Sequence, residues 1–208
     1  MARHSHQPHN HVRDSIAQLA ARLMAEGIED FALAKRKAAR QLGVSDAQHL
    51  PNNSEVEQAL RAYQALFGQA LHPGEDHQTT LRKLRAQALR IMRELERFDP
   101  LLTGSVLRGT ATPYSDINLM LFADSQKDIE LHLLNRDLPY KTSDKRFRFS
   151  DSTRMAPVLL LSFNGEADVR LAIFSAADRK CLPLSPVDGR PVQGARLAEV
   201  QSLLESRA

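Results

Sequence analysis

The chain has 208 residues, of which 42% are hydrophobic and 25% charged, and it carries a net charge of +3. These proportions exclude a wholly disordered, collagen-like or disulfide-stabilised small protein. One cysteine, Cys181, favours a reducing compartment, and no apolar run approaches the roughly 20 residues of a membrane span. Because the first residues are polar, we expect no secretion signal and predict a soluble cytoplasmic protein with no membrane partner.

The first half of the chain has the spacing of helices. Residues 1–11 predict a disordered tail, with a metal-binding tract as the alternative interpretation of its four histidines, His4, His6, His9 and His11. Residues 12–98 predict an all-helical region, with helices over 12–23, 30–41, 54–67 and 81–98. Gly43 is a candidate C-terminal cap of the second helix, and Ser54 with Glu57 is a candidate capping box of the third.

The last predicted helix of this region is strongly basic. Six basic residues fall between positions 81 and 98: Arg82, Lys83, Arg85, Arg90, Arg93 and Arg97. They form either a solvated helix face, the commoner case, or a surface for a polyanion such as nucleic acid or a triphosphate.

Short apolar runs replace the helical spacing after Pro100. They predict strands over 101–107, 117–122, 158–163 and 169–174, with a hairpin or two short strands at 140–142 and 146–149. Helices are expected over 125–135, capped by Ser125, and over 194–206. Residues 99–208 thus predict an α+β domain, a small mixed sheet flanked by helices and preceded by the helical region.

Residues with chemical potential gather between positions 104 and 118. Gly104 lets a backbone approach a bulky anion, and Ser105 adds a hydroxyl beside it. Asp116 and Asn118 lie two apart on a predicted strand, so their side chains leave the same face. A carboxylate and an amide oxygen aimed at one point suit a hard cation such as Mg²⁺.

This pattern resembles the nucleotidyltransferase superfamily, which includes polymerase-beta-like enzymes and minimal nucleotidyltransferases. The resemblance rests on a Gly-Ser pair, a ten-residue spacer (Val106–Ser115) and an Asp-apolar-Asp position, here Asp116-Ile117-Asn118. It implies that Gly104 and Ser105 hold nucleotide phosphates and that Asp116, Asn118 and a later carboxylate hold metal. Arg108 either contacts phosphate or pairs with a carboxylate near the turn.

The later carboxylate implied by the resemblance is Asp168, with Glu166 as the fallback. Alternation along the following strand predicts that Glu166, Asp168 and Arg170 share one face. Arg170 would there either balance the carboxylates or meet a phosphate.

Asn118 departs from the superfamily pattern, because a neutral amide stands where the second carboxylate is expected. The leading prediction is a transferase that uses Mg²⁺ or Mn²⁺ to move a nucleotidyl group from a nucleoside triphosphate to an acceptor. Nucleic acid, protein and small molecules remain open as acceptors. The alternatives are a catalytically weakened module that binds nucleotide or RNA, and an antitoxin-like role in protein interaction.

Overall fold

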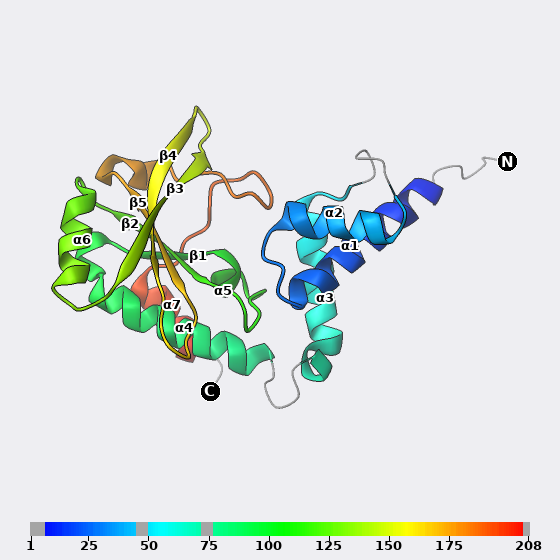
Figure 1. Cartoon of the computed structure of the whole chain (residues 1–208), viewed down its shortest axis with the longest axis horizontal. Coiled ribbons are helices and arrows are strands. Elements are labelled where there is room, and N and C mark those ends of the chain that lie inside the picture. Colours follow the sequence, from blue (N-terminus) through cyan, green and yellow to red (C-terminus); the bar gives the residue numbers. More distant parts are fainter. Residues whose placement is uncertain (1–6, 45–49, 72–76, 206–208) are drawn as a thin grey trace. The chain divides into compact units, whose positions relative to one another are not determined.

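The computed structural model describes residues 7–44, 50–71 and 77–205, and it divides the chain into two compact units (Figure 1). The first unit comprises residues 1–77 and 186–188, and the second comprises residues 78–185 and 189–208. The helices and strands of the second unit confirm the predicted α+β class. No helix in the described ranges is both long and apolar enough to cross a membrane.

The described residues of the first unit form the helices α1 (Gln7–Ala25), α2 (Phe31–Gln41) and α3 (Asn53–Leu71). Its core consists largely of alanines from α1 and α2, packed with larger apolar side chains such as Ile16 and Leu60. Helix α1 begins inside the predicted tail; His4 and His6 lie outside the described residues, as does the side chain of His9.

Gly43 ends α2 as predicted. It has a left-handed backbone (φ +69°), and its N–H and that of Val44 donate to the carbonyls of Arg40 (3.2 Å) and Ala39 (2.9 Å). This pair of bonds closes the helix in the manner of a Schellman motif.

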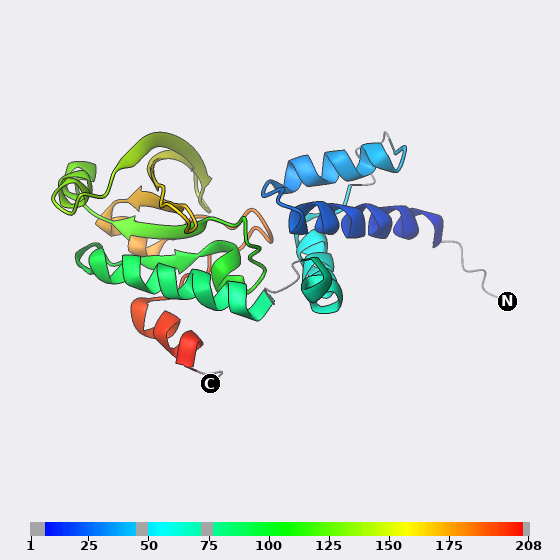
Figure 2. The same ribbon diagram turned by 60° about the horizontal axis from the view of Figure 1, so that its bottom comes forward.

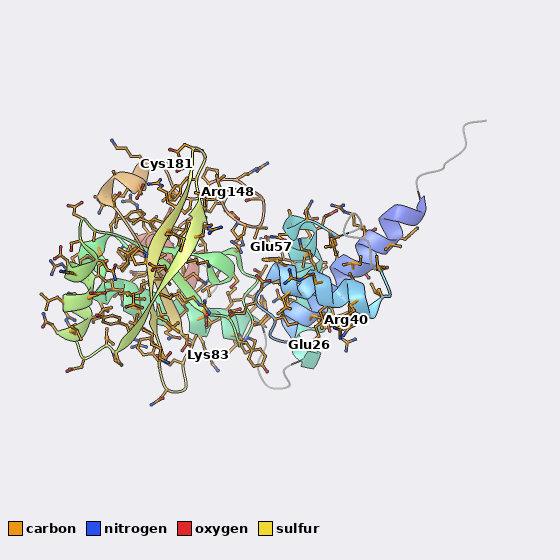
Figure 3. All side chains as sticks on the ribbon, turned by 45° about the horizontal axis from the view of Figure 1, so that its top comes forward. Glu26, Arg40, Glu57, Lys83, Arg148 and Cys181 are labelled. Carbon is orange, nitrogen blue, oxygen red and sulfur yellow. The ribbon has the colours of Figure 1, made fainter. Side chains whose placement is uncertain are left out.

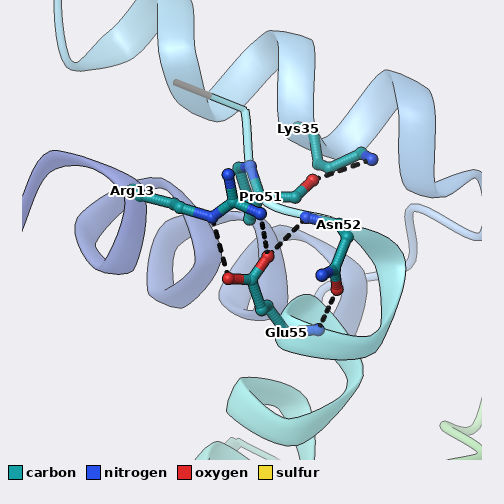
Figure 4. A network of polar contacts seen from close by, with 5 residues as sticks. All are labelled: Arg13, Lys35, Pro51, Asn52 and Glu55. Carbon is teal, nitrogen blue, oxygen red and sulfur yellow. Dashed lines mark hydrogen bonds and ion pairs between the residues drawn. The ribbon is translucent and has the colours of Figure 1, made fainter. Parts of the chain in front are cut away.

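The predicted capping box of α3 is wrong by two residues. The Asn52 side chain accepts from the Glu55 N–H (2.8 Å), and the Glu55 carboxylate accepts from the Asn52 N–H (2.6 Å) (Figure 4). Glu55 also receives two bonds from Arg13 of α1, at 2.8 and 2.7 Å. Because this carboxylate both caps α3 and ties it to α1, the helix begins at Asn53 instead of after Ser54.

The second unit is built on a five-stranded mixed sheet in the order β1-β2-β5-β4-β3. Its strands are β1 (Leu101–Thr103), β2 (Ile117–Phe122), β3 (Tyr140–Arg148), β4 (Thr153–Leu161) and β5 (Val169–Phe174). Strands β2 and β5 pair in parallel, whereas every other pair is antiparallel. The small mixed sheet is therefore as predicted.

Three parts of the predicted sheet differ from the observed strands. The run predicted at 158–163 belongs to β4, which begins earlier, at Thr153, and ends at Leu161. The run 101–107 is strand only to Thr103, because the left-handed backbone of Gly104 (φ +77°) turns the chain into a short helix, α5 (Gly104–Arg108). The two short strands predicted at 140–142 and 146–149 are one continuous strand, β3, which pairs along its whole length with β4.

The two faces of the sheet have different coverings. One face packs its odd-numbered β2 and β5 residues into the main core with α4 (His77–Glu94), α6 (Gln126–Leu134) and α7 (Leu197–Glu205); Figure 2 shows α4 and α7 on that side. The even-numbered residues face the other way. Farther along these strands they form a smaller apolar cluster with Phe147, Phe149 and Leu182. Two short 3₁₀ segments, Glu96–Phe98 and Ala176–Lys180, complete the unit.

Candidate functional site

The predicted Gly-Ser element lies at the turn between β1 and α5. Gly104 and Gly109 both have left-handed backbones, with φ of +77° and +81°, and they bracket the five residues of α5. The Ser105 carbonyl accepts from the N–H groups of Gly109 (2.9 Å) and Thr110 (3.0 Å). Gly104, Ser105 and Arg108 are all half-buried here. The turn therefore holds the predicted phosphate-binding residues in one short, well-bonded segment.

The sheet register brings Asn118 to this turn. Asn118 pairs with Thr103 of β1 on one side and with Arg170 of β5 on the other. A Cβ built on Gly104 would lie 3.3 Å from the Asn118 amide nitrogen. Asn118 thus occupies the space that any side chain at position 104 would need.

One hydrogen bond orients the side-chain amide of Asn118: its Nδ2 donates to the main-chain carbonyl of Asp116 at 3.2 Å. The main-chain carbonyl of Asn118 separately accepts from the Thr103 hydroxyl at 3.2 Å. A carboxylate at this position would have no N–H for the Asp116 carbonyl. An amide therefore suits this arrangement better than the acid of the superfamily pattern.

Asp116 forms an ion pair with Arg170. The guanidinium Nε of Arg170 donates to Oδ2 of Asp116. The Asp116 side chain is only 14% exposed, whereas that of Arg170 is 44% exposed. Of the two alternatives for Arg170, balancing a carboxylate is the one that the structure shows. The cation is the part of the pair that faces solvent.

Asp168 stands at the same end of the sheet as Asp116. The Ile117 N–H donates to the Asp168 carbonyl at 2.9 Å, and the next residues, Ile117 and Val169, are partners in the parallel ladder. The two aspartates thus precede neighbouring strands and lie next to each other along the backbone. Within the described ranges, no side-chain bond of Asp168 is found.

Gln87 of α4, which the sequence analysis missed, holds the segment that carries Asp168. Its buried amide donates to the Ala167 carbonyl (2.7 Å) and accepts from the Ala167 N–H (3.1 Å). In the sequence, the one indication of this role is that Gln87 is a polar residue beside the apolar stripe of its helix.

Glu166, the fallback for the third carboxylate, is not part of this group. It lies in the turn before β5, and its carboxylate pairs with Arg90 of α4. The strand begins only at Val169, so the alternation expected for Glu166, Asp168 and Arg170 does not extend back to Glu166 or Asp168.

Several side chains of the basic helix have intramolecular partners. Arg85 donates to the carbonyls of Val106 and Leu107, both at 3.2 Å, and so satisfies the end of α5. The Arg93 guanidinium donates to the side-chain oxygen of Gln201 on α7 at 3.4 Å. Lys83, labelled in Figure 3, is an exposed residue of the same helix. These contacts favour the structural interpretation of the basic segment over a polyanion surface.

The residues present do not fit the two divalent cations that the resemblance implies. Among the residues whose positions are described, no group of three or more His, Cys, Asp or Glu side chains is arranged to hold a metal ion. The Asp116 carboxylate is engaged by Arg170, and Asn118 turns its N–H toward a main-chain carbonyl. A pair of divalent ions needs several oxygen ligands converging on each, which this set does not supply.

The sequence matches no protein-family model and no curated protein. Among solved structures, the chain is similar to a crystal structure of the Cid1 poly(U) polymerase with MgGTP bound, at 20% identity and a TM-score of 0.30. The match covers 45% of this chain and 32% of the polymerase, so the chain spans about a third of that protein.

Proposed function

We propose that the second unit is a nucleotidyltransferase-type module that binds a nucleoside triphosphate and has little capacity for metal-dependent transfer. The observation that carries this proposal is the Asp116–Arg170 ion pair beside Asn118 and the Gly104 turn. Following the resemblance, Gly104, Ser105 and Arg108 would receive the phosphates. Arg170 would add a positive charge at the solvent side of the same group.

The charges of the site favour binding over transfer. Two aspartates and Arg170 give a formal charge of −1, and Arg108 on the adjacent turn brings the sum to 0. A neutral site with exposed guanidinium accepts a polyanion far more readily than three converging carboxylates would in the absence of metal.

Calorimetric titration with each of the four common nucleoside triphosphates tests the binding proposal. We expect the wild type to bind at least one of them, and Ser105→Ala to weaken that binding by several-fold through loss of one hydrogen bond. Ser202→Ala, at an exposed position of α7, is the matched control and should bind as the wild type does. Failure of all four nucleotides to bind would refute the proposal.

A second candidate function, metal-dependent nucleotidyl transfer, is favoured by one observation: Asp116 and Asp168 precede the paired residues of two neighbouring parallel strands. Incubation with a nucleoside triphosphate labelled at the α-phosphate, in Mg²⁺ or Mn²⁺, tests it. Label transferred by the wild type and not by Asp116→Ala would replace the binding module with an enzyme.

A further inference from the structure

We propose that the Arg170 guanidinium takes the place of a divalent cation in this site, so that the site excludes metal and receives triphosphate without it. This inference rests on the proposed nucleotide binding. The side chains present do not fit the cations that the resemblance implies.

The first step is the position of the charge. Arg170 is the direct ladder partner of Asn118. Asp116 lies two residues before Asn118, immediately before the first residue of β2. A cation bound by the Asp116 carboxylate would stand over this edge, and the guanidinium already occupies that position.

The second step is the burial of the pair. Because the Asp116 side chain is only 14% exposed and its Oδ2 accepts from Arg170, a metal ion would have to compete with the guanidinium for that oxygen. Guanidinium–carboxylate bonds are charge-assisted, and displacement of one partner of a covered pair leaves the other uncompensated. The pair therefore competes directly with metal.

The third step is the orientation of Asn118. Its donor group is committed to the Asp116 carbonyl, and its nitrogen lies against Gly104. This bond uses the one property, an N–H donor, that an aspartate at position 118 would lack. With Asn118 neutral and Asp116 paired, the more exposed charge at this end of the strands is the Arg170 guanidinium.

Strand β3 adds a second cation to the same face of the sheet. The row that contains Asn118 and Arg170 continues through Leu160 of β4 to Lys141 of β3, which is exposed. Alternate residues on paired strands share a face, so Lys141 stands on the side of Arg170. The triphosphate would thus meet two cations on one face of the sheet.

Binding of inorganic tripolyphosphate and of the four nucleoside triphosphates, in excess EDTA and in Mg²⁺, tests the inference. We expect the wild type to bind in EDTA, and Arg170→Gln to weaken that binding about tenfold or more. Arg170→Lys keeps the charge and should retain part of the affinity.

The matched control is Arg154→Gln. Arg154 pairs with Asp178 at 2.8 Å, and the two side chains have the same exposures, 44% and 14%, as Arg170 and Asp116. Burial raises the pKa of Asp178, but its bonds to Ser175 and Arg154 lower it below the ordinary value, so this too is a genuine ion pair. Arg154→Gln should leave triphosphate binding unchanged.

Electron paramagnetic resonance with Mn²⁺ alone separates this inference from the proposed function. We expect no Mn²⁺ bound to the wild type and binding to folded Arg170→Gln, because that variant removes the guanidinium that bonds Oδ2 of Asp116. Wild-type Mn²⁺ binding that Asp116→Asn removes, or no Mn²⁺ gained by Arg170→Gln, would overturn the exclusion of metal.

Triphosphate binding that requires Mg²⁺ and is unaffected by Arg170→Gln would overturn the inference and leave the proposed function intact. If no triphosphate binds in either condition, the proposed function fails with the nucleotide step, and the Mn²⁺ result still decides whether the guanidinium excludes metal.

Discussion

A side chain at position 104 would have to share space with Asn118. The left-handed backbone of Gly104 costs a non-glycine residue about 1–2 kcal/mol, and the added Cβ would lie 3.3 Å from the Asn118 nitrogen. Gly165 has nearly the same backbone, φ +75° against +77°, but open space where its Cβ would be. Comparing substitutions at the two glycines therefore separates the cost of a left-handed backbone from the effect of contact with Asn118.

Gly104→Ala and Gly165→Ala should each lower the free energy of unfolding by about 1–2 kcal/mol through backbone strain. Only Gly104→Ala should also weaken triphosphate binding, since it pushes on Asn118. Urea denaturation and calorimetric titration measure the two effects. Equal triphosphate affinity in both variants would show that the Gly104 turn is outside the binding site.

Gln87→Ala should destabilise the second unit by about 1–3 kcal/mol, because it leaves both backbone groups of Ala167 without their buried partner. Hydrogen exchange at Ala167 and Asp168 should rise, which mass spectrometry can follow. Gln201→Ala, at an exposed position of α7, should change stability by less than about 0.5 kcal/mol. An unchanged exchange rate at Ala167 would show that Gln87 does not hold this segment.

Sequence identifies site residues whose partners are close along the chain. It misses residues whose partners are distant along the chain. Gly104, Asp116 and Asn118 stand within one short segment, so their spacing alone singles them out. Gln87 acts on a residue 80 positions away, and Arg85 acts on carbonyls 21 and 22 positions away. Such partners emerge only once α4 is packed against the sheet.

Helix α3 shows how two overlapping patterns compete for one helix start. Asn52 with Glu55 and Ser54 with Glu57 both have the spacing of a capping box, so local sequence alone does not choose between them. Arg13 of α1 decides, because its two bonds fix the Glu55 carboxylate at the N-terminus of α3. Beside them, Lys35 of α2 donates to the Pro51 carbonyl at 3.0 Å, and burial lowers the pKa of its ammonium.

The Glu55 contacts predict an acid-sensitive link between α1 and α3. The hydrogen bonds from Arg13 hold the pKa of Glu55 below its ordinary value, against the opposing effect of burial. A depressed carboxyl pKa gives stability that is fully present above the ordinary pKa, about 4.3, and is lost as the pH falls through the folded value. Protection of α1 and α3 amides from hydrogen exchange should therefore decline below about pH 4.3.

Glu55→Gln should abolish that pH dependence and lower stability at neutral pH by about 1 kcal/mol, a cost typical of a lost cap and a partly exposed ion pair. Glu26→Gln is the control, since the exposed Arg22–Glu26 pair joins residues only four positions apart at the end of α1. It should change protection by less than about 0.5 kcal/mol. A pH profile that Glu55→Gln leaves intact would place the acid-sensitive group elsewhere.

The two units are stabilised by cores of different kinds. Small alanine side chains let α1 and α2 of the first unit approach closely, whereas the second unit buries branched side chains from β2, β4, β5 and α4. Leu171 is fully buried at the centre of this second core, between its ladder partners Leu119 and Leu159. Stability of the sheet therefore depends on a few large side chains.

Leu171→Ala should destabilise the second unit by about 2–5 kcal/mol, the usual cost of a cavity in a well-packed core. Amide exchange in β2, β4 and β5 should accelerate, with α1 and α2 as an internal reference because their core contains no residue of that cluster. Leu131→Ala, 59% exposed on α6, should have little effect. Equal effects of the two substitutions would contradict the assigned core.

The arrangement of the sheet was less predictable than its components. Apolar runs predict β2 and β5 with their observed bounds, 117–122 and 169–174. Strand β3 is mostly polar and exposed, so no apolar run indicates its full length. The order β1-β2-β5-β4-β3 follows from pairings across the whole domain, which spacing along the chain does not encode.

Strand β3 is the last strand on one side of the sheet, and near its end the Arg148 carbonyl accepts from the Leu184 N–H at 2.6 Å. The backbone along such an edge strand can pair with a strand of another molecule. Strand β3 carries Lys141, Lys145, Arg146 and Arg148, all exposed, against the single acid Asp144. Two such edges brought together would repel each other, so the charge on β3 protects the protein against edge-to-edge aggregation.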